Sequence, residues 1–454
     1  MSEPDLSRPR RVHIVGIGGA GMSAIATVLV AMGHEVSGSD LKDGVALERL
    51  RALGVRVAIG HDRANIGAAD FLAISSAVAA TNVEVAEAAR RGTVVHRRAE
   101  LLAAITRHKR TISVSGTHGK TTTSSMLALI LVEAGLSPSF IIGGEINEIG
   151  SGAVWDEGQW LVVEADESDG TFLELAAEIA VVTSVEPDHL DHYGNFESLV
   201  AAFGRFLGAA SRAVVFGDDP RVAQLAPPGA MTYGFGAGSS WRITEFAGGR
   251  SDVSFVLEGP GTTTPLSLPV PGRHNALNAT GAAAAAVAAG ADLEAVRRAL
   301  ARFGGVARRF EFRGEAQGAT LVDDYAHLPS EVAAALATAR RGGWRRVVCV
   351  FQPHRYSRIA ALAGEFADAF ADADELIVTD IYGAGEVPRP GISGKLVADA
   401  VLAAHPGAAV SYLPQRADVV ARLRQTLRAG DCCLTLGAGD LTSLAGELVA
   451  GSAG

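Results

Sequence analysis

Two strand–glycine loop–helix units constrain the fold of this 454-residue chain more than any other feature. The first, "RVHIVGIGGAG", starts at Arg11 and runs into apolar residues at helical spacing between Met22 and Val30, which Gly33 ends. A further strand, "EVSGSD", starts at Glu35. A strand, a helix and a second strand in this order form a βαβ unit, which predicts a parallel sheet.

The first glycine loop, "GIGGAG", has the spacing of a diphosphate site. Glycines allow a tight turn and a close approach of backbone N–H groups to phosphate at a helix N-terminus. Asp40 follows at the end of the next strand, where an acid can bind a ribose hydroxyl. The motif leaves NAD, FAD and a nucleotide sugar open as ligands, and this loop alone favours a dehydrogenase. The residues of this candidate site are Gly16, Gly18, Gly19, Gly21 and Asp40.

The second loop, "SGTHGKTTT", is a shortened phosphate-binding loop. In the common pattern G-x-x-x-x-G-K-[ST] the first glycine would fall on Val114. Gly116 and Gly119 still free the backbone for phosphate, and a strand precedes the loop while a helix follows it. Lys120 can reach the terminal phosphates as a point charge, and the Thr121 hydroxyl can hold Mg²⁺. We therefore expect an ATP site here.

Acidic residues follow the next two strands, where a phosphoryl-transfer site needs metal ligands. The first strand ends in "EADESD", and Mg²⁺ takes only one or two protein ligands, so most of these acids have another role. Glu164 and Asp166 stay open as ligands, whereas Glu167 and Asp169 are expected to be solvated loop or helix-capping residues. The second strand ends in "EPDHLDHYG", where His189 is a candidate ligand.

Composition excludes several classes of protein. The chain is 48% hydrophobic and 20% charged, which is typical of globular domains, and its net charge of -10 argues against general nucleic-acid binding. The alanine-rich segment at 281–291 is too short and too weakly apolar to span a bilayer. No secretory signal opens the sequence, and the 3 cysteines lack zinc-ligand spacing. We expect a cytoplasmic protein without membrane insertion.

A third segment contains the expected strands "TLVDDYAH", "RRVVCVFQP", "ELIVTDIY", "VSYLP" and "CCLTLGAGD", separated by helical stretches. This alternation predicts another open parallel sheet. The whole chain is therefore predicted to be an α/β protein of three domains, with limits at 1–107, 108–312 and 313–454.

These motifs together resemble the Mur ligases, the ATP-dependent amide-bond-forming enzymes of peptidoglycan precursor synthesis. In that family the short loop reads G-T-x-G-K-[TS], so the loop at 116–121 is intact. The resemblance extends from Gly16 to Asp440 in the family's order, through these motifs: "GIGGAGMS", "SGSD", "SGTHGKTTT", "EADESD", "DHLDHY", "PGRHNALNA", "RRFE", "DDYAH", "FQPHRYSR", "DIYGAGE" and "GAGD".

The resemblance implies a Rossmann-like N-terminal domain that binds UDP, a central P-loop ATPase domain and a Rossmann-like C-terminal domain that closes over the site. The first glycine loop then holds a UDP diphosphate rather than NAD, with Ser75 and Ser76 as further candidates. It also implies ATP contacts from the second loop and beyond it: Gly116, Thr117, His118, Gly119, Lys120, Thr121, Thr122, His274, Asn275, Asn278 and Arg308. Thr121, Glu164 and His189 would hold Mg²⁺.

The same resemblance places the amino-acid end of the site in the third domain. Tyr325, His354, Arg355 and Arg358 would bind the amino acid, and two arginines three positions apart could share a face of a helical turn. Lys120, His189, Arg308 and His327 would be catalytic. His189, His327 and His354 all remain open as the base that takes a proton from the amine.

Lysine usage and one substitution refine the resemblance. The lysines are Lys42, Lys109, Lys120 and Lys395 alone, so the stretch between Lys120 and Lys395 has no residue that could be the carbamylated lysine found in the central domain of most Mur ligases. A histidine at position 189, as in the alanine-adding branch, fits this gap. The family pattern D-D-Y-[GA]-H-H-P has Leu328 in place of its second histidine here.

The expected activity is therefore the ATP-dependent joining of L-alanine to the muramoyl carboxylate of UDP-N-acetylmuramate, by a monomer or homodimer. A ligase that attaches a preformed tripeptide to the same substrate has similar N-terminal and central motifs and is the nearest alternative. A nicotinamide-dependent dehydrogenase is a distant one, because it leaves the second nucleotide loop unexplained. A non-enzymatic ATP switch leaves the His- and Arg-rich third segment unexplained.

Overall fold

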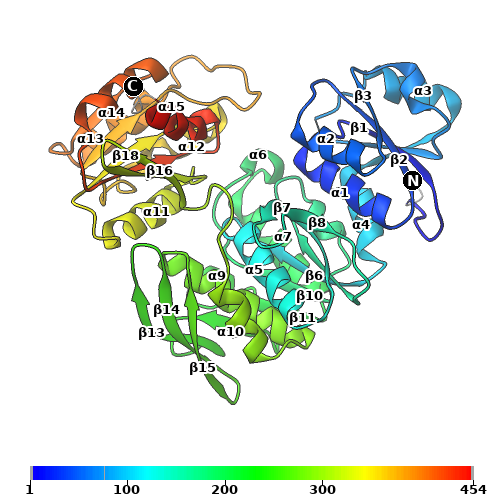
Figure 1. Cartoon of the computed structure of the whole chain (residues 1–454), viewed down its shortest axis with the longest axis horizontal. Helices are drawn as coiled ribbons and strands as arrows, with labels where there is room; N and C mark the ends of the chain where they lie inside the picture. Colours follow the sequence, from blue (N-terminus) through cyan, green and yellow to red (C-terminus); the bar gives the residue numbers. More distant parts are fainter. Residues whose placement is uncertain (1–3, 76, 451–454) are drawn as a thin grey trace. The chain divides into compact units, whose positions relative to one another are not determined.

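The computed structural model describes residues 4–75 and 77–450. These residues form three β-sheets with flanking helices, so the predicted α/β class is confirmed (Figure 1). The chain divides into two compact units. The first contains the residues up to 244, 257–264 and 278–300, and the second contains 245–256, 265–277 and the residues from 301 on. The limits of three domains at 107 and 312 stay predictions.

The first sheet is parallel and has five strands in the order β3-β2-β1-β4-β5. Strand order reverses between β1 and β4, which is where open α/β sheets bind ligands. Helices α1 and α2 lie on one side of the sheet and α3 on the other (Figure 1). The elements are β1 (Arg11–Val15), α1 (Ala20–Ala31), β2 (Glu35–Asp40), α2 (Val45–Ala52), β3 (Arg56–Ile59), η1 (Arg63–Ile66), β4 (Phe71–Ile74), α3 (Val83–Arg91), β5 (Val94–Arg97) and α4 (Arg98–Thr106).

The second sheet has ten strands in the order β15-β14-β13-β12-β11-β10-β6-β9-β7-β8. Its central strands β6, β9, β10 and β11 pair in parallel, which places their carboxyl ends at one edge. The strands are β6 (Arg110–Ser115), β7 (Ser139–Ile146), β8 (Ser151–Val154), β9 (Trp160–Glu164), β10 (Ile179–Val182), β11 (Arg212–Phe216), β12 (Met231–Gly234), β13 (Trp241–Gly248), β14 (Val253–Gly259) and β15 (Thr262–Leu268). The helices are α5 (Lys120–Glu133), η2 (Thr171–Glu174), α6 (Leu190–Tyr193), α7 (Phe196–Ala209), α8 (Pro220–Ala223), α9 (Arg273–Ala289) and α10 (Leu293–Ala301).

The third sheet has six strands in the order β16-β17-β21-β18-β19-β20 and is parallel except for β16, which runs antiparallel to β17. The strands are β16 (Glu311–Ala316), β17 (Ala319–Asp324), β18 (Arg346–Phe351), β19 (Glu375–Val378), β20 (Val410–Tyr412) and β21 (Asp431–Leu436). The helices are α11 (Pro329–Arg341), α12 (Tyr356–Leu362), η3 (Ala363–Phe366), α13 (Lys395–Ala404), α14 (Arg416–Thr426), η4 (Asp440–Ser443) and α15 (Leu444–Ala450).

Both faces of the third sheet are covered, and the alternation along β18 shows how. Val347, Cys349 and Phe351 belong to one buried apolar cluster, while Val348 and Val350 belong to another. Successive side chains of a strand point to opposite faces, so a strand with two covered faces needs an unbroken apolar run. The run "VVCVF" in the sequence is explained in this way.

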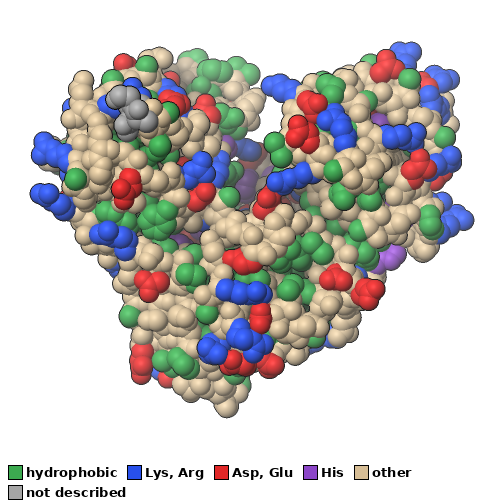
Figure 2. All heavy atoms as spheres, in the orientation of Figure 1, with side chains coloured by type: hydrophobic (Ala, Val, Ile, Leu, Met, Phe, Trp, Pro, Cys, Tyr) green, Lys and Arg blue, Asp and Glu red, His purple; other side chains and the backbone are tan. Residues whose placement is uncertain are grey.

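Charged side chains are mixed over the face shown in Figure 2, where Lys and Arg are interspersed with Asp and Glu. The described helices include none that is both long enough and apolar enough to cross a bilayer.

Leu328, the residue that departs from the family pattern, is 2% exposed and lies in the cluster that also contains Val332 and Leu336 of α11. The side chain at position 328 is therefore part of the buried apolar core. We predict that Leu328→His lowers the stability of the chain by about 2–5 kcal/mol, because apolar burial is lost and an imidazole is buried.

Differential scanning calorimetry of the full chain measures this effect. Leu402→His is the control, since Leu402 lies on α13 and is 38% exposed. Equal melting temperatures for the two variants would contradict the packing role of Leu328.

Candidate functional site

The second glycine loop joins β6 to α5 in a conformation that requires its glycines. Gly116 has φ +136° and Gly119 has φ +79°, both in the region that favours glycine. A Cβ atom on Gly116 would lie 2.2 Å from Thr183 Oγ1, and one on Gly119 would lie 2.5 Å from Asn278 Oδ1. The loop is therefore closely packed, and a residue other than glycine at either position would also strain the backbone. Asn278, predicted to contact ATP, is thereby placed beside the loop.

Residues that follow β10 hold this loop in place. The His118 backbone N–H donates to Ser184 Oγ at 2.8 Å, and the Thr117 N–H donates to the Ser184 carbonyl at 3.1 Å. In return, the Glu186 N–H donates to Thr117 Oγ1 at 2.9 Å. These contacts leave the start of α5 with its N–H groups and positive dipole end at the loop, an arrangement that favours phosphate.

Lys120, the first residue of α5, is held between the loop and the acidic segment after β9. Its Nζ donates to the Gly116 carbonyl at 2.6 Å and to Glu167 Oε1 at 2.9 Å. Burial alone would lower the pKa of Lys120, but the nearby carboxylates of Glu167 and Asp166 outweigh it and raise the pKa. The lysine therefore carries its positive charge at neutral pH.

The expectation of a solvated Glu167 is wrong. This side chain is 1% exposed, and it pairs with Lys120. A buried carboxylate is costly unless it meets a positive charge, and the lysine supplies one. Asp169, in contrast, accepts from the Thr171 N–H at 3.0 Å at the start of η2, as a capping residue does.

Two oxygen-bearing side chains predicted to bind Mg²⁺ lie together. Thr121 Oγ1 donates to Glu164 Oε1 at 2.9 Å, and Glu164 Oε2 accepts from the Gly143 N–H at 2.7 Å. His189 precedes α6 with φ +53°, and its Nε2 is 3.3 Å from Asp188 Oδ2. Residues 4–75 and 77–450 contain no cluster of three His, Cys, Asp or Glu side chains arranged to hold an ion. Thr122, also predicted to contact ATP, is 6% exposed in the first turn of α5.

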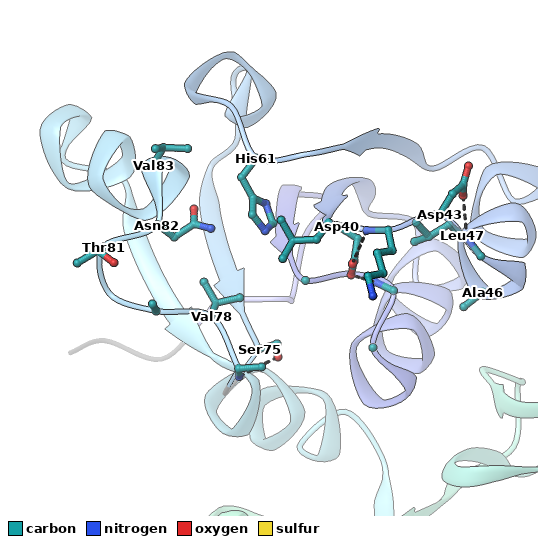
Figure 3. A pocket seen from close by; sticks show the side chains of 18 residues that line it. Asp40, Asp43, Ala46, Leu47, His61, Ser75, Val78, Thr81, Asn82 and Val83 are labelled. Carbon is teal, nitrogen blue, oxygen red and sulfur yellow. Dashed lines mark hydrogen bonds between the residues drawn. The ribbon is translucent and has the colours of Figure 1, made fainter. Parts of the chain in front are cut away.

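The first glycine loop borders a cavity of about 880 Å³ (Figure 3). Gly18 N–H donates to Asp40 Oδ2 at 2.8 Å, so Asp40 braces the loop from the end of β2. Five of the predicted UDP-binding residues line the cavity: Gly16, Gly18, Gly19, Asp40 and Ser75. Ser76 lies outside the described residues.

Gly21 has a different neighbour from the rest of the loop. A Cβ atom there would lie 3.2 Å from Arg98 Nη1, at the start of α4. Arg98 also pairs with Asp169 at 3.2 Å and approaches Asp166 at 3.9 Å. Burial alone would raise the pKa of Asp169, yet hydrogen bonds from Thr171 and the charge of Arg98 hold that pKa below its usual value. Arg98 thus lies between the first loop and the acidic segment within this unit.

In the second unit, Arg308 is fixed to the glycine turn after β21. It has φ +60°, and its Nη2 donates to the Gly437 carbonyl at 2.6 Å and the Gly439 carbonyl at 3.2 Å. Its guanidinium carbon lies 4.9 Å from the centre of the Tyr325 ring, within cation–π range.

The residues predicted for the amino-acid end cluster at the carboxyl ends of β17 and β18. The His327 ring lies 5.4 Å from Tyr325 and 5.6 Å from His354, measured between ring centres. Arg358 Nη1 donates to His354 Nδ1 at 2.9 Å. Arg358 lies inside α12, but Arg355 precedes this helix with φ +67°, so the expectation that both share a regular helical turn is wrong for Arg355.

Two residues predicted to contact ATP, His274 and Asn275, are at the start of α9. Asn275 Nδ2 donates to the Pro271 carbonyl at 2.7 Å, which uses one of its two amide N–H groups within the chain. Burial, together with the charge of Arg309, lowers the pKa of His274 to about 4. His274 is therefore neutral at physiological pH.

Three family profiles match the chain in succession. They are described as Mur ligase family, catalytic domain, at residues 11–110, Mur ligase middle domain at 114–286, and Mur ligase, glutamate ligase domain, at 308–439. The chain belongs to the Mur ligase family. Among relatives, a UDP-N-acetylmuramate–L-alanine ligase from Kineococcus radiotolerans is 48% identical over 98% of this chain and 96% of the relative. One of the same name from Anaeromyxobacter sp. is 45% identical over 98% of both chains.

Solved Mur ligase structures resemble this fold. The crystal structure of the UDP-N-acetylmuramate–alanine ligase MurC from Thermotoga maritima is 29% identical, with a TM-score of 0.81 over 97% of this chain and 98% of that one. A murein peptide ligase from Psychrobacter arcticus has a TM-score of 0.69 over 97% of this chain and 98% of its own length, but at 22% identity it shows the fold alone.

Sequence reasoning missed several residues that contact the candidate site residues. Tyr382 stacks on His354 with ring centres 5.8 Å apart, and its position in "DIYGAGE" was the available signal. Ser184, which supports the phosphate loop, stands just before "EPDHLDHYG". No local pattern marked Arg98, because its partner Asp169 is distant in the sequence.

We predict that Gly116→Ala weakens ATP binding by about tenfold or more, because the new Cβ atom must displace the loop from Thr183. Isothermal titration calorimetry with Mg²⁺ and ATP measures this. Gly135→Ala is the matched control, since Gly135 follows α5 with φ +69° and a Cβ there has open space. That variant should lose stability by about 1–2 kcal/mol but keep ATP affinity. An equal loss of ATP affinity in both variants would contradict the role of the loop.

Proposed function

We propose that this chain is an ATP-dependent ligase that joins L-alanine to the muramoyl carboxylate of UDP-N-acetylmuramate in peptidoglycan precursor synthesis. The observation that carries the proposal is its 48% identity, over nearly its full length, to a relative of that name. The intact phosphate loop, with its charged lysine, supports the use of ATP. A cytoplasmic location and a monomeric or homodimeric state remain predictions.

The reaction needs activation of the carboxylate, because a carboxylate and an amine do not form an amide unaided at neutral pH. In the proposed route, a muramoyl carboxylate oxygen attacks the ATP γ-phosphorus and ADP leaves. The amine of L-alanine then attacks the carbonyl carbon of the acyl phosphate, and phosphate leaves with its bridging oxygen. The products are the amide, ADP and phosphate, with one proton released from the amine.

Lys120 is proposed to stabilise the transferred phosphoryl group. Its position at the start of α5 and its charge suit a phosphate contact at the helix N-terminus. Glu167 holds the ammonium group beside the loop before ATP binds, so little reorientation is needed. Burying the Glu167 carboxylate costs free energy, and its proposed contribution to catalysis is to hold Lys120 in position.

Thr121 and Glu164 fit Mg²⁺, because a hydroxyl and a carboxylate oxygen 2.9 Å apart are hard donors of the kind this ion prefers. We propose these two residues as ligands, with His189 as the third. When bound, the ion would neutralise negative charge that develops on the phosphates.

At the amino-acid end, we propose that Arg358 and Arg355 bind the alanine carboxylate, with Tyr325 and His354 beside it. Arg308, supported by the 437–439 turn, would contact the ATP phosphates.

The hydrogen bonds of the histidines favour His327 as the base that takes the proton from the amine. Its Nδ1 donates to the Tyr325 carbonyl at 2.9 Å and lies 3.3 Å from Glu331 Oε2, so a neutral His327 ring carries its proton on Nδ1. In neutral His354 the lone pair on Nδ1 already accepts from Arg358.

The test is phosphate release and product mass with ATP, Mg²⁺ and UDP-N-acetylmuramate. L-Alanine, D-glutamate and the L-alanyl-γ-D-glutamyl-diaminopimelate tripeptide are added separately. Phosphate release with L-alanine, with the matching mass gain on the UDP substrate, is expected. Release with the tripeptide alone would assign the chain to the tripeptide ligases instead.

Lys120→Ala is predicted to abolish ATP-dependent product formation, because the phosphate charge loses its nearest cation. Binding of UDP by the variant should stay close to that of the wild type. Lys395→Ala is the control, since this exposed lysine on α13 pairs with Asp399. Turnover of Lys120→Ala near the wild-type rate would refute the assignment of the loop.

Arg358→Ala is predicted to raise the KM for L-alanine by about tenfold to a hundredfold, the value of a charge-assisted hydrogen bond, and to change the KM for ATP little. Steady-state kinetics with each substrate varied in turn measures both constants. Arg313→Ala, at an exposed pair with Glu311, is the control. Equal changes in the two KM values would argue against a carboxylate contact.

A further inference from the structure

A fully buried carboxylate lies behind the first cavity and has no part in the chemistry described above. Glu84, in the first turn of α3, is 0% exposed. Its Oε1 accepts from Asn65 Nδ2 at 2.7 Å and from the Asp62 N–H at 3.1 Å. Its Oε2 accepts from Ser39 Oγ at 2.6 Å and lies 3.3 Å from His13 Nε2. The two oxygens thus serve two separate sets of partners.

Glu84 is ionised despite its burial. Burial alone would raise its pKa, but hydrogen bonds from His13, Ser39 and Asn65 outweigh this and lower the pKa to about 2. Its place in the first turn of α3 adds the favourable end of the helix dipole. An ionised carboxylate only accepts hydrogen bonds, so the Ser39 hydroxyl must donate its proton to Glu84.

The direction of this hydrogen bond determines which ring nitrogen of a neutral His61 carries the proton. Since the Ser39 hydroxyl donates to Glu84, its oxygen is free to accept, and His61 Nδ1 lies 2.9 Å from it. Neutral His61 therefore carries its proton on Nδ1 and its lone pair on Nε2. His61 lines the cavity, and Figure 3 shows it between the segment around Asp40 and the segment from Thr81 to Val83.

The position of His61 indicates which part of a nucleotide it meets. The glycine loop follows β1, whereas His61 follows β3, and β2 lies between these strands. Two strand spacings correspond to about 10 Å. With a diphosphate on the glycine loop, a group at this distance within the same cavity is the nucleoside part of the ligand.

We propose that Glu84 and Ser39 are positioning residues that hold His61 as a hydrogen-bond acceptor for the uridine part of the nucleotide substrate. His61 Nε2 accepts from an O–H or N–H donor of uridine, either a ribose hydroxyl or the uracil N3–H. This inference rests on the proposed function, which supplies UDP as the ligand of the first cavity. It adds a binding contact and the two buried residues that orient it.

The two sets of partners on Glu84 provide a matched control. Ser39→Ala and His61→Ala interrupt the path from Glu84 Oε2 to the cavity. Asn65→Ala removes a partner of Oε1 and leaves that path intact. Asn65 is absent from the residues that line the cavity. A general loss of stability would appear in all three variants, whereas a loss of the positioned acceptor would appear in two.

Isothermal titration calorimetry of the full chain with UDP is the test. Ser39→Ala and His61→Ala should weaken UDP binding by about three- to tenfold, the range of one hydrogen bond. Asn65→Ala should bind UDP like the wild type, even with a lower melting temperature. His61→Gln, whose amide oxygen can replace the acceptor at Nε2, should recover part of the affinity.

Analogues distinguish the two donors. 2′-Deoxy-UDP, 3′-deoxy-UDP and N3-methyl-UDP are titrated into the wild type and into His61→Ala. The analogue that lacks the donor should lose affinity for the wild type but not for His61→Ala. The inference is overturned if no analogue shows this difference, if His61→Ala binds UDP like the wild type, or if the wild type does not bind UDP. UDP binding without any ligation product would refute the proposed reaction and leave the role of His61 standing.

Discussion

The buried pair between Lys120 and Glu167 is the interaction on which the nucleotide site depends. It joins the first residue of α5 to the segment after β9, and Lys120 also donates to the Gly116 carbonyl of its own loop. A buried ion pair survives only when each charge is matched, so the loop and the acidic segment must keep their relative positions. The parallel order of β10, β6 and β9 brings these segments to one edge of the sheet.

The two glycine loops are held in position in the same way, but by different residues. Each follows a buried parallel strand and precedes a helix, and each is braced by a polar residue from a neighbouring strand end. Asp40 accepts from the first loop, and Ser184 accepts from the second. In both cases the brace leaves other N–H groups available for phosphate. A hydrogen-bonded network runs from the buried Glu84 through Ser39 to His61, which lines the first cavity away from the glycine loop.

The strand and helix pattern could be predicted because it depends on local periodicity. The role of the glycines at 116 and 119 could also be predicted, since their positive φ angles strain any other residue. The burial of Glu167 could not be predicted, because a carboxylate in a loop is buried only if the fold brings a cation to it. The left-handed conformation of Arg355 and the antiparallel edge strand β16 depend in the same way on tertiary contacts rather than on local sequence.

Oxygen transfer from substrate to phosphate tests the proposed reaction most directly. UDP-N-acetylmuramate labelled with ¹⁸O in its muramoyl carboxylate is incubated with the chain, ATP, Mg²⁺ and L-alanine, and the released phosphate is analysed by mass spectrometry. The acyl-phosphate route predicts one ¹⁸O atom in each phosphate and one retained in the amide. Phosphate without ¹⁸O, formed together with the amide product, would contradict activation of the carboxylate by phosphoryl transfer.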